Sequence, residues 1–600
     1  MRRIFFDLHG LPPGDADVTA FEKEYSVDQD KAILDLVNRL LESPRYGERW
    51  GQHWLDVVRY AESDGYRADD YRPETWMYRD YVIRSFNEDK PYHQFIREQL
   101  AADEIDGDNP DALIATAFLR LGIYEWNQRN SRMQRELILT EMTNVTSETF
   151  LGLGMGCAQC HDHKFDPILQ KDYFALQSFL NATWWPENEL LASPKERSAY
   201  DAKMHEWETA TKALREELDT LTASLYEGKR KGAVKQFPED IQAIYWKKRE
   251  DRTAEEEQLT QLVQRQVDFE YRRLNFAKSF EKDPPKLAKY LELTTALKAF
   301  DSVKPAPLPA AFITTDVGTK PAQTVMKRRA GEEVVEPAFL TLLGQAAPKI
   351  TPTAKTTGRR TALAAWIASS ENPFTARVMV NRIWQRHFAE GLVATPNDFG
   401  MLSEPPSHPE LLDWLTSRFL GNDWKMKELH RTILTSATYR QTARREPTKE
   451  EAVADPLNRL LWRYPPQRLD AEEIRDAALA ASGELTNRDG GAAVEGTVPN
   501  RSIYVMKKRN TSDPILGEFD SPSGFSTTPN RIPTTTPIQS LLLVNGAWSL
   551  SRAETFAKRV LAGVSTFDAE QVRKAYRLAY GREALTEEVE ASLTFVESQA

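Results

Sequence analysis

The residues of this 600-residue sequence with the most distinctive chemistry lie in one short run, Cys157-Ala158-Gln159-Cys160-His161. The run contains both cysteines of the chain, and a histidine directly follows the second one. Two residues between the thiols allow both sulfurs to form thioethers with the vinyl groups of one haem, and the adjacent imidazole then lies beneath the iron. The spacing therefore predicts a c-type haem site, held by Cys157, Cys160 and His161.

Two alternatives to haem stay open. The cysteines could form a dithiol or a disulfide that merely precedes a histidine. A non-haem zinc or iron site could instead use His161, His163 and Asp166, because imidazole and carboxylate groups are common metal ligands. His163 is too close in sequence to His161 to reach the opposite face of a haem without an unusual loop. His163 could instead contact a haem propionate, or it could be an ordinary surface histidine.

The ligand on the distal side of the iron is not determined by the spacing. Met155 and Met142 are candidates, because thioether ligation raises the potential of a haem. Methionines more often fill hydrophobic cores. An open distal position would instead suit catalysis on a small oxidant or substrate.

Two further polar groups are candidate sites. Asp64, Arg79 and Asp80 belong to a stretch of carboxylates and arginines that could hold a sugar or an ion, although structural ion pairs explain it equally well. His387 shares a helical face with the apolar residues of 380–388, which predicts that its ring points inward. A hydrogen-bonded core histidine is the more common outcome there, and a ligand role is the alternative.

Helices are expected to position these residues. Apolar residues recur at helical spacing over 28–46, in a helix that closes at Ser43-Pro44, and helices are also expected over 76–86 and 134–151. The glycines between 152 and 156 end the third helix and allow a sharp turn. Both cysteines should therefore lie in a loop at the end of a helix.

The composition changes along the chain and indicates a multi-domain, mainly α protein. Residues 1–190 form a helical domain with the cysteine motif, and leucines at heptad spacing in 195–300 predict an inserted helical hairpin that resembles a coiled coil. Residues 301–350 are rich in Pro, Thr and Val and predict a small β-element. Residues 351–600 predict a mostly helical domain. Its expected elements are helices over 361–368, 376–390, 409–420, 425–435 and 471–482, a strand over 502–505, and helices from 537 onward.

Charge and hydropathy exclude several classes of function. The net charge of -11 argues against a nucleic-acid-binding surface, and no run approaches the roughly 18 apolar residues that a membrane-spanning helix needs. Phosphate-binding glycine loops and the GxSxG and HExxH motifs are absent from the sequence. No export signal is visible at the start, whereas haem c is attached outside the cytoplasm. We therefore expect a chain truncated at both ends, from a protein of the periplasm or cell envelope.

Longer motifs resemble two bacterial families. The first half is similar to the planctomycete cytochrome-C-like domain family and the second to the planctomycete-specific domain that usually follows it. Together they cover nearly the whole chain. The motifs of the first are Tyr46-Gly47-Glu48-Arg49-Trp50, His53-Trp54-Leu55-Asp56, Arg59 to Tyr66, Tyr78 to Ile83 and Cys157 to Pro167, and those of the second are Asn381 to Trp384, Asp398-Phe399-Gly400, Ser407 to Leu415, Tyr439-Arg440-Gln441 and Arg468 to Glu472.

The resemblance implies a large exported protein, often preceded by a further cytochrome-c-like domain. It carries haem ligation over only to Cys157, Cys160 and His161, and it implies no catalytic residues. The expected function is electron transfer to a redox partner protein, or oxidation of an extracellular substrate such as a carbohydrate. The alternatives are a metal-dependent hydrolase that uses the cluster at 161–166 and a binding or scaffold protein of the cell envelope.

Overall fold

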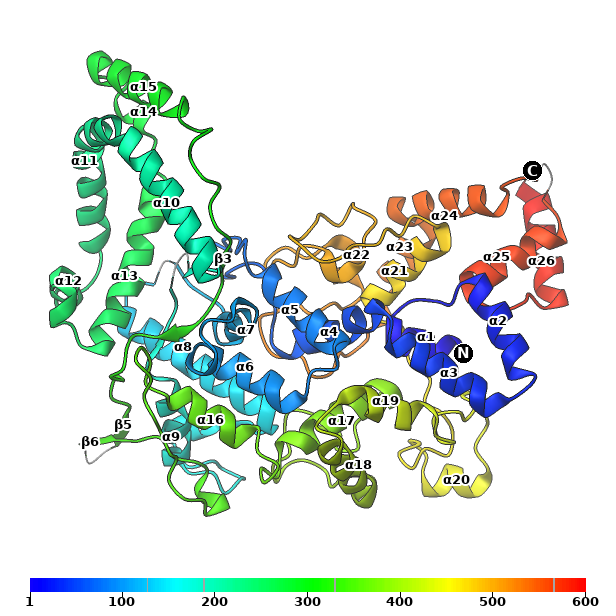
Figure 1. Ribbon diagram of the computed structural model, residues 1–600. Helices are drawn as coiled ribbons and strands as arrows, with labels where there is room; N and C mark the ends of the chain where they lie inside the picture. Colours follow the sequence, from blue (N-terminus) through cyan, green and yellow to red (C-terminus); the bar gives the residue numbers. More distant parts are fainter. Residues whose placement is uncertain (127, 187–188, 329–330, 565–566, 600) are drawn as a thin grey trace.

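The fold is helical, as predicted. The computed structural model describes residues 1–126, 128–186, 189–328, 331–564 and 567–599. Within these ranges the chain forms 26 α-helices and six short strands. Figure 1 shows a broad helical body from which a helical arm projects. Across the described ranges, every helix is too short or too polar to span a lipid bilayer.

Both halves of the chain contribute to the main hydrophobic core of the body. Residues 1–190 and 351–600, which the composition divides into separate domains, therefore pack on each other through shared apolar side chains. The helices around this core include α3 (Gln29–Leu41), α4 (Pro44–Val57), α5 (Trp76–Asn87), α6 (Tyr92–Ile105), α8 (Ser131–Thr146), α9 (Gln170–Leu180), α16 (Arg359–Ile367), α17 (Thr375–Phe388), α18 (Pro409–Gly421) and α19 (Met426–Leu434).

The helix predicted over 28–46 is two helices in the structure. Asp28 caps α3 by accepting a hydrogen bond from the N–H of Lys31 (3.0 Å), and α3 ends at Leu41. Ser43 caps α4, and Pro44 occupies its first turn, where the missing N–H of a proline costs nothing. Pro44 therefore opens the second helix rather than closing the first.

The body contains further helices. They include the predicted helix over 471–482 and the predicted helical region from 537 onward, which are confirmed. They are α1 (Arg2–His9), α2 (Asp15–Tyr25), α7 (Pro110–Ala115), α20 (Lys449–Ala454), α21 (Ala471–Ser482), α22 (Pro514–Glu518), α23 (Pro537–Asn545), α24 (Ala547–Val560), α25 (Ala569–Tyr580) and α26 (Thr586–Gln599).

The arm contains more than the predicted hairpin. Its main helix, α11 (Lys212–Val234), carries the heptad leucines, which are half-buried, and packs against α13 and α15. A small separate core around Phe237 and Val263 holds the lower part of the arm together. The remaining helices of the arm are α10 (Pro194–Ala210), α12 (Glu239–Trp246), α13 (Ala254–Arg272), α14 (Phe276–Ser279) and α15 (Pro284–Lys298).

The β-element is not self-contained. Strand β4 (Thr315–Asp316) pairs with β1 (Thr183–Trp184), and β3 (Ala310–Ala311) pairs with β2 (Glu189–Leu190). Among the described residues of 301–350, only β5 (Val325–Arg328) and β6 (Gly331–Val334) pair with each other. The predicted β-element is therefore not an independent unit, because β3 and β4 pair with strands that precede the arm in the sequence.

The strand predicted over 502–505 is wrong. Ser502–Tyr504 forms a short 3₁₀ helix. The backbone N–H and the hydroxyl of Ser502 donate hydrogen bonds to the carboxylate of Asp476 (2.9 and 2.6 Å). A polar contact with a residue of α21 therefore sets the local conformation, and the apolar pattern does not.

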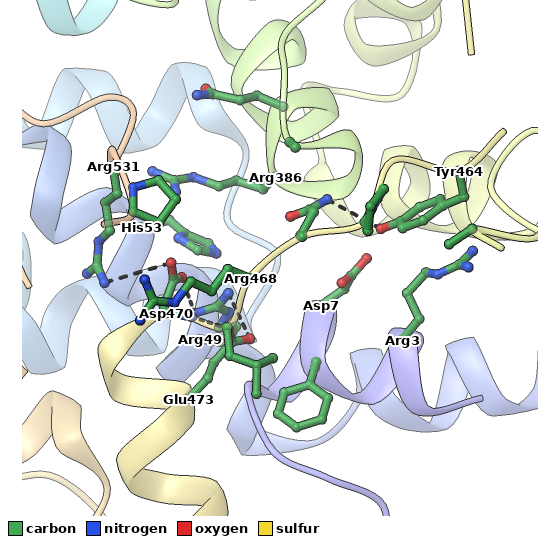
Figure 2. Close-up of a pocket in the computed structure, with 18 of the residues that line it drawn as sticks. Arg3, Asp7, Arg49, His53, Arg386, Tyr464, Arg468, Asp470, Glu473 and Arg531 are labelled. Atoms are coloured by element: carbon green, nitrogen blue, oxygen red, sulfur yellow. Dashed lines mark hydrogen bonds and ion pairs between the residues drawn. The ribbon is translucent and has the colours of Figure 1, made fainter. Parts of the chain in front are cut away.

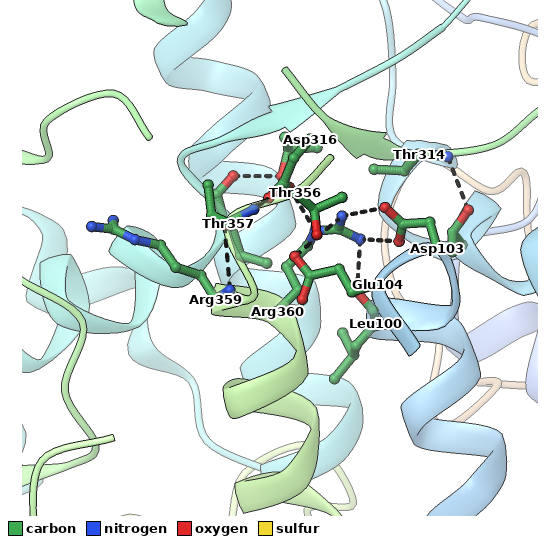
Figure 3. Close-up of polar contacts among 12 residues, drawn as sticks. Leu100, Asp103, Glu104, Thr314, Asp316, Thr356, Thr357, Arg359 and Arg360 are labelled. Carbon is green, nitrogen blue, oxygen red and sulfur yellow. Dashed lines mark hydrogen bonds and ion pairs between the residues drawn. The ribbon is translucent and has the colours of Figure 1, made fainter. Parts of the chain in front are cut away.

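One buried arginine connects three segments of the body (Figure 3). Arg360, at the start of α16, donates two hydrogen bonds to the carboxylate of Asp103 on α6 (2.7 and 2.6 Å). Its Nε also donates to Asp316 on β4 (3.0 Å), and Glu104 lies 3.6 Å away. The Arg360 side chain is fully buried, so these carboxylates supply the counter-charge that water cannot.

Candidate functional site

The cysteine motif lies in a loop that follows α8. After α8 the chain makes one wider helical turn, Ser147–Leu151, and leaves it at Gly152, whose φ of 60° lies in the left-handed region that favours glycine. A short 3₁₀ helix, Met155–Gln159, then carries Cys157. The prediction that both cysteines lie in a loop at a helix end is confirmed.

The reactive groups of the motif face solvent. Cys157 and Cys160 are free thiols and are exposed, and His161 is exposed as well. The N–H of Cys160 donates to the carbonyl of Cys157 (3.4 Å), which places both cysteines in one turn. Both sulfurs are therefore accessible to a reagent or to a prosthetic group from outside.

The ring of His161 is held in one tautomer. Its Nδ1 lies 2.7 Å from the carbonyl oxygen of Asp162. Because a carbonyl oxygen only accepts, Nδ1 carries the proton, and the lone pair of the neutral ring is on Nε2. Metal-ligating histidines commonly donate their other N–H to a carbonyl in this way. His161 is thus in a tautomer that can ligate iron through Nε2.

His163 and Asp166 contact each other, and Asp166 also contacts the second half of the chain. Asp166 accepts a hydrogen bond from the backbone N–H of Met401 (2.6 Å). The Nδ1 of His163 lies 2.9 Å from the backbone nitrogen of Asp166 and 3.1 Å from its Oδ2. In the described part of the chain, no group of three or more His, Cys, Asp or Glu side chains is arranged to hold a metal ion. The structure does not bring His161, His163 and Asp166 together as such a group.

Both candidate distal ligands are buried, whereas the thiols of the motif are exposed. Met142 and Met155 are 1% and 0% exposed, and both pack in the main hydrophobic core. Either thioether would have to leave that core to reach an iron tethered at the exposed thiols. The structure places both methionines in the role of core side chains.

The four residues of the candidate polar sites belong to three separate groups. Asp64 accepts from the guanidinium of Arg72 (2.5 Å) and from the indole N–H of Trp126 (2.6 Å). Burial raises the pKa of Asp64, but Arg72, Arg265 and the hydrogen bond from Trp126 together lower it by more, so the net shift is downward. Arg79 donates to Asp80 (2.9 and 2.8 Å). These are structural ion pairs.

The other oxygen of Asp80 also has a backbone partner, because it accepts from the N–H of Gly491 (2.6 Å). The third group contains His387, which is fully buried, as its apolar neighbours predict. Its Nδ1 lies 3.0 Å from the carboxylate of Asp7, and its Nε2 lies 2.9 Å from Nδ1 of His430.

A cavity of about 700 Å³ lies elsewhere, between residues from both halves of the chain (Figure 2). Four of its charged or ionisable residues, Arg49, His53, Arg468 and Asp470, lie within the sequence motifs, which assigned them no role. The charged and ionisable residues that line it are Arg2, Arg3, Asp7, Arg49, His53, Arg386, Arg444, Arg468, Asp470, Glu473 and Arg531.

Comparison with known families matches two parts of the chain. Residues 1–184 match PSCyt2, described as "Protein of unknown function (DUF1549)". Residues 359–596 match PSD1, described as "Protein of unknown function (DUF1553)". No curated protein and no solved structure matches the chain. Two segments of the chain therefore match domains of unknown function, in the order of the planctomycete-type domain pair that its motifs resemble.

Proposed function

We propose that this chain carries one covalently attached haem at Cys157, Cys160 and His161, and that it acts in electron transfer or oxidation outside the cytoplasm. The observation that carries the proposal is the pairing of two accessible free thiols with an imidazole whose Nδ1 is bonded to the Asp162 carbonyl (2.7 Å). This donor set fits haem c, because the thiols would bond to the vinyl groups and Nε2 would be free to ligate the iron.

The chain's own contribution is attachment and orientation. Cys157 and Cys160 lie in one turn and would fix one edge of the macrocycle, and the Asp162 carbonyl holds the ring of His161 in its tautomer. The bound group would supply one-electron chemistry. Because Met142 and Met155 are buried in the core, the proposal leaves the distal side open, either to a redox partner protein or to an extracellular substrate such as a carbohydrate.

The test is to express the chain behind an export signal in a bacterium that attaches haem c. We expect a Soret band and haem that stays with the polypeptide on a denaturing gel. Replacing both cysteines (C157A/C160A) should abolish covalent haem, and His161→Ala should change the spectrum of the iron. His205→Ala is the matched control, because His205 is an exposed histidine on α10.

Colourless protein from that host would overturn the proposal. If the colourless protein bound zinc or iron, the hydrolase that uses His161, His163 and Asp166 would take its place. If it bound neither, the cell-envelope scaffold would remain. An unchanged spectrum in His161→Ala would refute this residue as the ligand.

A further inference from the structure

The 700 Å³ cavity lies between the two matched segments of the chain. Arg3 and Asp7 come from α1, and Arg49 and His53 come from α4, all in the first matched segment. Residues of α17, of the loop before α21 and of the segment before α23 complete the walls from the second. Figure 2 shows Arg49, Arg386, Arg468 and Arg531 around His53 on one side, with Arg3, Asp7 and Tyr464 on the other.

The walls carry a large excess of positive charge. Seven arginines line the cavity, but only three carboxylates do. Two of these, Asp470 and Glu473, each lie 3.0 Å from a guanidinium nitrogen of Arg49. The third, Asp7, accepts a hydrogen bond from Tyr439 (2.8 Å) and lies 3.0 Å from Nδ1 of His387.

Arg531 is paired as well, with Asp56 (2.7 Å) and Glu472 (2.5 Å). These pairs fix the walls. The nearby carboxylates are therefore in direct contact with Arg49 and Arg531 rather than with the other arginines of the cavity.

Five lining arginines have no carboxylate oxygen within 4.0 Å in the described part of the chain. Arg386 is the most confined of them: its Nη2 donates only to the carbonyl of Pro529 (3.2 Å). Burial lowers the pKa of Arg386, Asp470 and Asp56 raise it in part, and the guanidiniums of Arg531 and Arg49 lower it again, so the net shift is downward. The buried charge of Arg386 is therefore only partly compensated by its neighbours. The five are Arg2, Arg3, Arg386, Arg444 and Arg468.

Two of these arginines are held in place by uncharged partners. The guanidinium of Arg3 lies 3.4 Å from the ring centroid of Tyr464 and donates to the carbonyl of Gln441 (3.3 Å). Arg468 donates to the side-chain carbonyl of Gln539 (2.8 Å). Neutral partners orient a guanidinium and leave its charge unneutralised, so these side chains are preorganised for an anion.

An unpartnered imidazole points to a ligand independently of the charge count. His53 lines the cavity and is 7% exposed. Its Nδ1 is buried and has no hydrogen-bond partner among the described residues. Burial lowers the pKa of His53 well below its ordinary value, and Arg386, Arg49 and Arg531 lower it further. The ring is therefore neutral and offers one donor and one acceptor beside the arginines.

We propose that this cavity binds a small organic polyanion, a molecule with two or more carboxylate, phosphate or sulfate groups. Guanidinium forks match the geometry of such oxyanions and bind them in a bidentate manner. The volume of about 700 Å³ lies in the range of small-molecule sites. The cavity uses neither the cysteines nor His161, so the inference stands whether or not haem is attached.

The experiment is isothermal titration calorimetry of the 600-residue chain with two probes, citrate and inorganic pyrophosphate. We expect one site for at least one probe, with affinity that falls as the salt concentration rises. Arg386→Gln and Arg468→Gln should each weaken binding about tenfold or more, because each removes a charge-assisted contact. Arg418→Gln should not weaken it, because Arg418 is on α18, where it pairs with Glu428 (3.5 Å).

Binding of citrate alone, or of pyrophosphate alone, supports the site and identifies its anion as a carboxylate or a phosphate. Failure of both probes to bind overturns the proposal, as does binding that both arginine variants leave unchanged. Arg386 is half-buried, so circular dichroism of Arg386→Gln must first show a folded chain. Arg468 is exposed, so its variant keeps the test decisive if the other does not fold.

Discussion

The carboxylate of Asp166 accepts a hydrogen bond from the backbone N–H of Met401 (2.6 Å), which fastens the loop after the cysteine motif to the C-terminal half of the chain. A second bond fastens the other side of the motif, because the N–H of Phe399 donates to the carbonyl of Gly152 (2.7 Å). The motif is therefore clamped at both ends by the segment 398–401. Its geometry depends on both matched domains.

The clamp predicts that Gly400 cannot be replaced by alanine without cost. A Cβ on Gly400 would lie 2.5 Å from Oδ1 of Asp166. The carboxylate would have to move and lose its bond to Met401, so we expect the free energy of unfolding to fall by about 1–3 kcal/mol. Urea unfolding measures this change.

Gly421→Ala is the matched control for that substitution. Gly421 ends α18, and no atom lies within 4 Å of its added Cβ. Its unfolding free energy should stay the same or rise by up to about 1 kcal/mol. Equal effects of the two substitutions would show that Asp166 does not clamp the loop.

The exposure of the thiols predicts a simple titration. Cys157 and Cys160 are the two cysteines of the chain and are both free and exposed. Haem-free, reduced protein should therefore react with an aromatic disulfide reagent at two thiols per chain without denaturant, because access and thiolate formation control the rate. Protein with attached haem should have no thiol that reacts. A requirement for denaturant in the haem-free form would contradict the exposed loop.

The buried charge at the centre of the body predicts a large loss of stability. Arg360→Met leaves Asp103, Glu104 and Asp316 without their shared cation, and the Arg360 side chain is fully buried. Removing one partner of a buried ion pair typically costs about 3–5 kcal/mol. We expect a loss of that size in the free energy of unfolding, measured with urea.

An exposed ion pair provides the control for Arg360. Arg377 pairs with Asp413 at 2.6 Å, but their side chains are 39% and 61% exposed. Arg377→Met should change the unfolding free energy by only about 0–1 kcal/mol. A comparable loss in both variants would mean that burial does not determine the strength of the Arg360 cluster.

Local features were predictable from the sequence. The motif of Cys157, Cys160 and His161 is contiguous, and glycines after a long helix locate its loop, so spacing alone found it. In α3, Ile33, Val37, Leu40 and Leu41 are buried as their periodicity predicts, whereas Leu34 of the same apolar pattern is 38% exposed. Where the sequence misled, a distant polar group decided the conformation, as Asp476 does for Ser502.

The arginine cavity could not be predicted because its parts are far apart in the chain. Arg3, Arg49, Arg386, Arg468 and Arg531 lie around one cavity only because the two halves of the chain pack together. Each arginine alone resembles a surface charge in the sequence. The heptad leucines show the same limit, since they predicted a helical arm but not the further helices that pack against α11.

A buried carboxyl predicts how stability depends on pH. Glu62 is 1% exposed, and burial raises its pKa to about 7, although Arg79 and a hydrogen bond from Tyr60 (2.7 Å) act in the opposite direction. In the unfolded chain the group titrates near 4.5. Between these values the native state holds a proton that the unfolded state releases, so this contribution to stability is complete below 4.5 and is lost as the pH rises through 7.

Glu62→Gln removes this titration and keeps an acceptor for Tyr60. We therefore expect the stability of the variant, relative to the parent, to rise by on the order of 3 kcal/mol between about pH 4.5 and pH 7.5. Urea unfolding at the two pH values gives this difference. Glu390→Gln changes an exposed residue, so its free energy of unfolding should differ from that of the parent by the same amount at both pH values. If Glu62→Gln also showed no change with pH, Glu62 would be ionised in the folded chain at neutral pH, and Arg79 would outweigh its burial.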